Sequence, residues 1–264
     1  MWQIALSDRS APGRWPGAIF RLAERAGIGA VVLHDEELVP ARRRWPWTRE
    51  DAGLWRGVSQ RAEVLDYTRG RLHRLRLERL QAGVRLAAWG LSPRPPHAVP
   101  EPGTILRYTL TAAAAAAFLG ARGLLLEGLA AWEPEAVTPF LQALLPALGG
   151  LRRMLLVQVP LRDLTLWKEI QAMAAFPIRP WAALDLMGEP PEGLPEVWDA
   201  MGIHVRMLML SVTPPILEWW VREGAEGLRR AGFAGLLSVT VPASTMEEAL
   251  RALTALRPPG EGRV

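Results

Sequence analysis

Short apolar segments of strand length alternate with segments of helical period eight times along this chain of 264 residues. The expected strands are apolar on both faces, which is typical of a parallel sheet covered by helices on both sides. They span residues 2–7, 30–34, 84–89, 124–127, 154–159, 181–186, 205–211 and 236–241. Eight strand–helix units in a chain of this length predict a single (β/α)8 TIM barrel over residues 1–264. The alternative, a doubly wound open sheet, rarely contains eight such even repeats.

The composition is that of an ordinary globular protein, with 50% hydrophobic and 22% charged residues. The longest uncharged apolar windows, 108–121 and 136–151, are too short to span a membrane. The chain has no cysteine, which excludes disulfides and thiolate metal sites. No basic segment precedes an apolar one at the N-terminus, so we expect a cytoplasmic protein without a signal peptide.

Asparagine is absent, and Lys168 is the only lysine among 31 basic residues. The loss of thermolabile asparagine and cysteine is typical of a thermophile. The formal net charge is only +4, so the arginine excess is not by itself a signal of nucleic-acid binding.

A barrel of this kind carries its active site at the carboxyl ends of its strands. The polar and aromatic residues at the expected strand ends are Ser7, Asp8, His34, Asp35, Trp89, Glu127, Gln158, Asp185, Ser211, Thr213 and Thr240. These residues are the first candidates for catalysis and ligand binding.

Four segments resemble the xylose isomerase-like superfamily of sugar-phosphate isomerases, epimerases and endonuclease IV-type enzymes. Residues 4–35 are similar to that family's opening: a strand, a helix ending Ala-Glu-Arg-Ala-Gly, and a second strand. Residues 118–123 (FLGARG), 183–187 (ALDLM) and 231–241 (AGFAGLLSVTV) resemble its segments at the fourth, sixth and eighth strands. The resemblance implies a xylose isomerase-like TIM barrel that acts on a sugar or sugar phosphate.

The resemblance also implies a divalent metal held by carboxylates and histidine at the ends of the later strands. The matching positions here are Gln158 and Thr240 for two glutamates, Leu208 and Ser211 for a His-x-x-Asp pair, and Gly188 for a histidine. Only Asp185 matches, and a single carboxylate is a poor ligand set for a divalent ion. We therefore expect no cofactor, and leave open a residual Mn, Mg, Zn or Co ion at Asp185.

Glu127 and Asp185 end the fourth and sixth expected strands, where both can face the mouth of the barrel. Two neighbouring carboxylates can separate their pKa values and serve as an acid and a base. The alternative is that each pairs with an arginine at the rim. The seventh strand offers no carboxylate, which disfavours glycoside hydrolysis.

His34 is a third catalytic candidate, as a general base or metal ligand beside Asp35. Adjacent strand residues face opposite ways, so the two cannot both point inward unless the strand has ended. The alternative is a hydrogen-bonded rim histidine. His73, His97 and His204 do not converge at zinc-ligand spacing.

Residues 42–47 combine three arginines with two tryptophans after the second strand. Arg42, Arg43 and Arg44 can bind phosphates, while Trp45 and Trp47 can stack on a sugar or base. The alternatives are a solvated basic loop and tryptophans that close over the core, and nucleic acid is the least favoured partner. No glycine-rich nucleotide motif is present.

Two hypotheses follow. The first is a divergent sugar or sugar-phosphate isomerase/epimerase with a depleted metal site, in which Asp185, Glu127 and His34 are catalytic. Its substrate-binding residues are Gln158, Thr240, Trp89, Arg42, Arg43, Arg44, Trp45 and Trp47. The second is a pseudoenzyme that binds a carbohydrate, an anionic ligand or a protein partner. Trp219 and Trp220 are adjacent and cannot both face the core, which leaves open a homo-oligomer contact.

Overall fold

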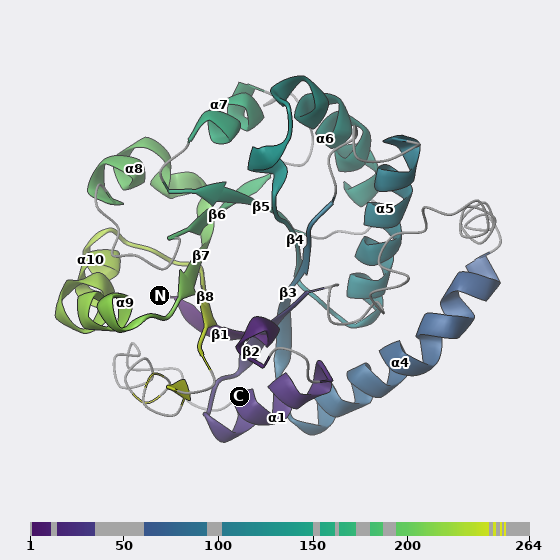
Figure 1. The fold of residues 1–264 in the computed structure, drawn as a ribbon, viewed down its shortest axis with the longest axis horizontal. Coiled ribbons are helices and arrows are strands. Elements are labelled where there is room, and N and C mark those ends of the chain that lie inside the picture. The colour runs from purple at the N-terminus through teal and green to yellow at the C-terminus, as the bar shows by residue number, and fades with distance from the viewer. Residues whose placement is uncertain are drawn as a thin grey trace.

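Eight parallel strands form a closed barrel in which each strand pairs with its neighbours in chain order, and β8 pairs with β1. The structure, a computed structural model, describes residues 2–11, 15–34, 61–93, 102–149, 154–161, 164–172, 180–186, 194–242, 245, 246, 249 and 251. Figure 1 looks into the ring of strands, with the helices outside it. The predicted (β/α)8 barrel is confirmed.

The strands are β1 (Gln3–Ser7), β2 (Ala30–His34), β3 (Arg85–Leu91), β4 (Gly123–Leu126), β5 (Met154–Pro160), β6 (Trp181–Asp185), β7 (Val205–Ser211) and β8 (Leu236–Thr240). The described helices are α1 (Gly17–Arg25), α4 (Arg61–Gln81), α5 (Pro102–Phe118), α6 (Pro134–Gly149), α7 (Thr165–Ala172), α8 (Leu194–Met201), α9 (Pro214–Trp219) and α10 (Ala225–Arg230). Short 3-10 turns are η1 (Asp8–Ser10), η5 (Leu129–Ala131) and η6 (Gly202–His204). None of these helices is long and apolar enough to cross a membrane.

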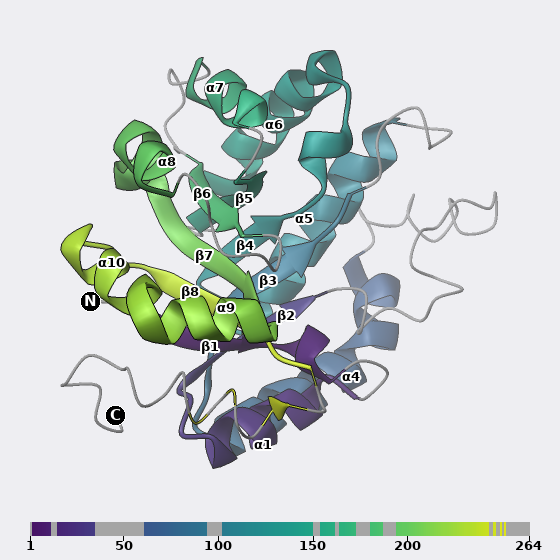
Figure 2. The ribbon, with the colours of Figure 1, turned by 60° about the vertical axis from the view of Figure 1, so that its left-hand side comes forward.

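The helical segment between β7 and β8 is interrupted by a π-helical turn. It begins at Pro214, where the Thr213 hydroxyl accepts a hydrogen bond from the Ile216 N–H at 3.4 Å. The turn, η7 (Trp220–Gly224), separates α9 from α10, and Figure 2 shows this segment on the outside of the barrel. Trp220 is buried edge-on against Trp2, whereas Trp219 is half-buried beside it.

Alternate residues of each strand belong to two separate hydrophobic cores. The outer core joins strand residues such as Leu6 and Leu33 to helix residues such as Phe20 and Leu144. The inner core contains strand residues alone: Ala5, Ala30, Val32, Ala87, Ala88, Leu125, Leu156, Ala183 and Met207. Because successive strand side chains face opposite sides, the second set fills the barrel and the first lies under the helices.

Several sequence candidates lie outside the described residues: Asp35, Arg42, Arg43, Arg44, Trp45, Trp47, His97 and Gly188.

Candidate functional site

The inner face of the barrel becomes polar at the carboxyl ends of the strands. Continuing the alternation of the inner core outward gives the inward-facing residues Ser7, His34, Gly90, Glu127, Gln158, Asp185, Ser211 and Thr240. We call this end of the barrel the mouth. Most of the candidates from sequence therefore converge there. Trp89 does not, because it faces the outer core beneath the helices, as Leu208 does.

Glu127 is the most heavily bonded of these side chains. Arg9 donates to it twice, from Nη1 to Oε1 at 3.0 Å and from Nη2 to Oε2 at 2.6 Å. Ser92 Oγ donates a longer bond to Oε2 at 3.3 Å. His34 Nε2 lies 3.5 Å from Oε1, an ion-pair distance longer than an ordinary hydrogen bond. The predicted alternative of an arginine partner therefore holds for Glu127.

His34 links Glu127 to a second buried carboxylate, that of Asp8. Asp8 Oδ1 lies 2.5 Å from His34 Nδ1, and Asp8 Oδ2 accepts the His34 backbone N–H at 2.8 Å. The two bonds fix both the ring and the strand end that carries it. With Nδ1–H bound to Asp8, the Nε2 edge of the ring is turned toward Glu127. Asp8, His34 and Glu127 thus form a line of three buried ionisable groups.

The surroundings of this line favour the charged forms of His34 and Glu127. Burial lowers the pKa of His34, but the charge and hydrogen bond of Asp8, with Glu127 behind, outweigh it and raise the pKa to about 9. Burial raises the pKa of Glu127, but His34 and then Arg9 lower it to about 2. At neutral pH the imidazolium and the carboxylate are therefore both ionised.

The turn after β1 is tied down on every side. The Arg9 N–H donates to Ser7 Oγ at 3.3 Å, while Asp8 accepts the backbone N–H of His34. Ser10 Oγ accepts the Val241 N–H at 2.9 Å, just beyond β8. These contacts hold η1 against both neighbouring strands, so the Arg9 side chain projects from a fixed backbone.

Gly90 provides the space for the imidazole. It pairs with His34 across β2 and β3, and a Cβ there would overlap the ring, lying 2.8 Å from Nε2. Only glycine leaves room for the ring between these strands.

Gln158 and Asp185 form a second polar group on the other side of Glu127. Gln158 Oε1 accepts a hydrogen bond from the Gly128 N–H at 2.9 Å, so the Nε2 group of Gln158 is the one left to donate. Gln158 Nε2 then donates to Asp185 Oδ2 at 2.7 Å. The structure thus brings Gln158 to Asp185, while Glu127 is bound to Arg9, His34 and Ser92.

This donor set does not fit a divalent metal. The residue beside Asp185 is an amide that directs N–H toward it, and an N–H cannot ligate a cation. Leu208 faces the outer core, and Ser211 and Thr240 supply only hydroxyls. Within the described part of the chain, no three His, Cys, Asp or Glu side chains are arranged to hold a metal ion.

Asp8, Arg9 and Ser92 are site residues that the sequence did not single out for a role. Asp8 is among the strand-end candidates, but the sequence gives no partner for it and places Asp35, not Asp8, beside His34. The available signal was four polar residues, Ser-Asp-Arg-Ser, directly after the first strand.

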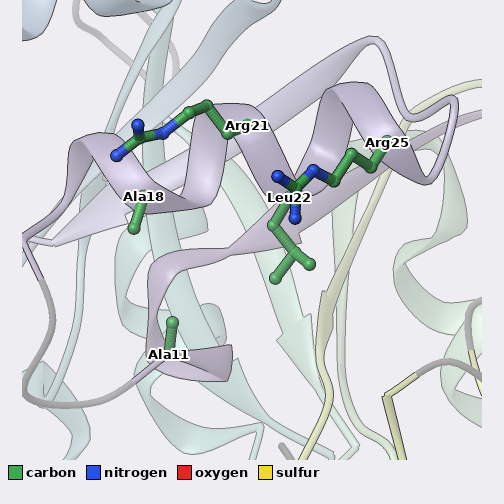
Figure 3. A pocket seen from close by; sticks show the side chains of 5 residues that line it. All are labelled: Ala11, Ala18, Arg21, Leu22 and Arg25. Atoms are coloured by element: carbon green, nitrogen blue, oxygen red, sulfur yellow. The ribbon is translucent and has the colours of Figure 1, made fainter.

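A separate hollow lies beside α1 rather than in the mouth. It is a cavity of about 230 Å³ lined by Ala11, Ala18, Arg21, Leu22 and Arg25 (Figure 3). Both arginines are exposed, and none of the inward-facing residues of the mouth lines it.

Comparison by sequence finds no match, either among protein-family models or among curated proteins. Comparison of structures finds many matches. A xylose isomerase domain protein from Planctomyces limnophilus superposes with a TM-score of 0.64 at 13% identity, covering 97% of this chain and 96% of that one. This chain has the xylose isomerase-like TIM-barrel fold.

Two other xylose isomerase-like barrels show how varied the neighbours are. The 3-keto-D-glucoside 4-epimerase of E. coli has a TM-score of 0.65 at 10% identity, covering 97% of this chain and 99% of that one. The IolI protein, solved with a bound zinc atom, has a TM-score of 0.64 at 10% identity and covers 96% of each chain. At these identities the likeness concerns the fold.

Proposed function

We propose that this chain binds a sugar or a similarly hydroxylated small molecule in the mouth, and that it isomerises or epimerises the molecule by proton transfer between Glu127, His34 and the ligand. The observation that carries the proposal is the line Asp8–His34–Glu127. Burying three ionisable groups costs desolvation free energy even when they pair with one another, and shifted pKa values of this kind gather at functional sites.

The three residues have distinct roles in this proposal. Asp8 holds the His34 ring so that its Nε2–H faces Glu127, as the carboxylate of a catalytic triad orients its histidine. Glu127 accepts a proton from a carbon of the ligand, while His34 Nε2 donates its own proton to the ligand oxygen that gains negative charge. Glu127 then delivers its proton to another carbon and His34 takes its proton back, so both groups end in their starting states. Because isomerisation moves a proton from one atom of the ligand to another, the reaction needs no net acid or base.

The remaining mouth residues suit a hydroxylated ligand. Gln158 and Asp185 together present amide and carboxylate groups, and Thr240 and Ser211 add hydroxyls. Two structural neighbours are a 3-keto-D-glucoside 4-epimerase and an L-ribulose 3-epimerase, which supports a sugar as the ligand. Because the donor set does not fit a divalent ion, we derive no step through a metal.

Ligand binding without turnover is the second candidate. It is favoured by the state of Glu127, whose oxygens already accept from Arg9 and Ser92 and whose pKa is lowered to about 2. A carboxylate held in this way is a weak base until a ligand rearranges its contacts.

One experiment in D2O separates the candidates. L-ribulose, D-fructose and D-glucose 6-phosphate are incubated with the protein, and NMR follows both saturation transfer to each sugar and loss of its C–H signals. We expect binding and exchange, with exchange reduced at least about 100-fold in Glu127→Gln. The matched control is Glu135→Gln, which alters an exposed glutamate in the first turn of α6.

Binding without exchange would favour the second candidate. Equal exchange by wild type and Glu127→Gln would contradict the assigned role of Glu127. Asp185→Ala adds a further check, because it should weaken binding if the mouth holds the sugar and leave it unchanged if the sugar binds elsewhere.

A further inference from the structure

Arg9 is the exposed member of the charged cluster in the mouth. Its side chain is 37% exposed, whereas those of Glu127, His34 and Asp8 are 4%, 3% and 2% exposed. A ligand that approaches this cluster from solvent therefore meets the guanidinium first.

We propose that Arg9 is the anion-binding residue of the mouth, and that it exchanges Glu127 for a carboxylate or phosphate group of the ligand. The inference rests on the proposed function and narrows its substrate to acidic sugars and sugar phosphates. The guanidinium already binds a carboxylate through Nη1 and Nη2, in the two-pronged geometry that also fits a phosphate.

The backbone around Arg9 allows this exchange. Ser7, His34 and Val241 fix the residues on both sides of it, so the long side chain can turn without moving the turn itself. Glu127, once released, is not left as an uncompensated buried charge, because His34 lies 3.5 Å away and Ser92 still donates to it.

The exchange also makes Glu127 a stronger base when the ligand binds. Arg9 is one of the two cations that lower the pKa of this carboxyl group, so its departure raises that pKa. An anionic ligand thus makes Glu127 a better proton acceptor as it arrives, whereas in the free protein the carboxylate stays bound. This resolves the conflict between a buried catalytic carboxylate and its saturated hydrogen bonds.

Three probes of matched shape test the inference: D-glucose, D-glucuronate and D-glucose 6-phosphate, titrated calorimetrically at constant ionic strength. The variants are Arg9→Gln and Arg9→Lys. Arg9→Lys keeps the positive charge but loses the paired Nη1 and Nη2 donors. The control is Arg222→Gln, an exposed arginine paired with Glu218 on the outer helix. We expect at least one anion to bind more tightly than D-glucose, and Arg9→Gln to weaken it by about tenfold or more. Arg9→Lys should weaken it as well, and Arg222→Gln should leave it unchanged.

The pattern of binding identifies the anion, since preference for D-glucuronate assigns a carboxylate and preference for D-glucose 6-phosphate assigns a phosphate. Equal anion affinity in wild type and both Arg9 variants would overturn the inference. Binding of D-glucose as tightly as the two anions would also overturn the inference. In that case the proposed function still stands if Asp185→Ala weakens the binding of D-glucose. If none of the three probes binds, the inference fails, and the proposed function fails with it only if L-ribulose and D-fructose also neither bind nor exchange their C–H protons. Thermal melting of each variant verifies that it is folded, and Arg9→Lys replaces Arg9→Gln should the latter not fold.

Discussion

Because His34 is a buried imidazolium, the free energy of unfolding of this barrel should fall as the pH becomes alkaline. An ordinary histidine has lost its proton by pH 8, whereas the carboxylates of Asp8 and Glu127 raise the pKa of His34 to about 9. The side chain is only 3% exposed, so solvent screens these interactions little. Protonation of His34 is therefore coupled to folding.

The sign and size of the effect follow from the two pKa values. Below pH 6.5 both the folded and the unfolded histidine are protonated, and the full stabilisation is present. Between pH 6.5 and about 9 only the folded state keeps the proton, so the free energy of unfolding falls as pH rises. Above pH 9 the contribution from His34 protonation is nearly lost. At about 1.4 kcal/mol per pH unit, the difference is about 3 kcal/mol.

Urea denaturation between pH 6 and pH 10 measures this loss. We expect wild type to lose about 3 kcal/mol across that range. His34→Gln should be less stable at pH 6 and should vary little with pH. His73→Gln is the control, because His73 is exposed on α4, and it should follow wild type. A wild-type stability that is flat to within about 0.5 kcal/mol would refute the ionised pair, as would an NMR titration midpoint of His34 near its ordinary value of about 6.5.

Two further substitutions probe the packing and chemistry of the mouth. Gly90→Ala places a Cβ against the His34 ring and should cost about 1–3 kcal/mol in urea denaturation; Gly70→Ala, where a Cβ meets nothing within 4 Å on helix α4, should be neutral or stabilising. Gln158→Glu puts a second carboxylate beside Asp185, so it should lower the melting temperature and create a Mn²⁺ response that EDTA reverses. Gln171→Glu, on the exposed side of α7, should change neither, and a Gln158→Glu protein indifferent to Mn²⁺ would show that the two carboxylates do not converge.

The barrel could be predicted because its determinants are local and repeated. Each strand is a short apolar run, and each expected strand lies within two residues of the observed one. The period-2 alternation then indicates which residues face inward at the strand ends, and Glu127, Gln158, Asp185 and His34 do so. Trp89 faces outward because the chain bulges between residues 87 and 88, where β3 shifts its register against β2.

The partners of those residues could not be predicted, because they depend on contacts between distant parts of the chain. Asp8 and His34 are 26 residues apart, and Arg9 and Glu127 are 118 apart. Sequence placed Asp35 next to His34 because the two are adjacent, whereas the bond that fixes the ring comes from Asp8, in the turn η1 that follows the neighbouring strand β1. The register between β1 and β2 decides this, and no residue pattern specifies it.

The two polar groups of the mouth show how carboxylates are neutralised at the strand ends of this barrel. A carboxylate at a strand end must be neutralised by something, since burying it alone is too costly. Glu127 is neutralised by Arg9 and His34, and Asp185 accepts a hydrogen bond from the amide of Gln158, so both carboxylates have donors within the chain. Any chemistry at the mouth must therefore begin by breaking one of these bonds. The bond between Arg9 and Glu127 is the one to break, because Arg9 alone in its cluster reaches solvent and because Glu127 keeps His34 as a partner afterwards.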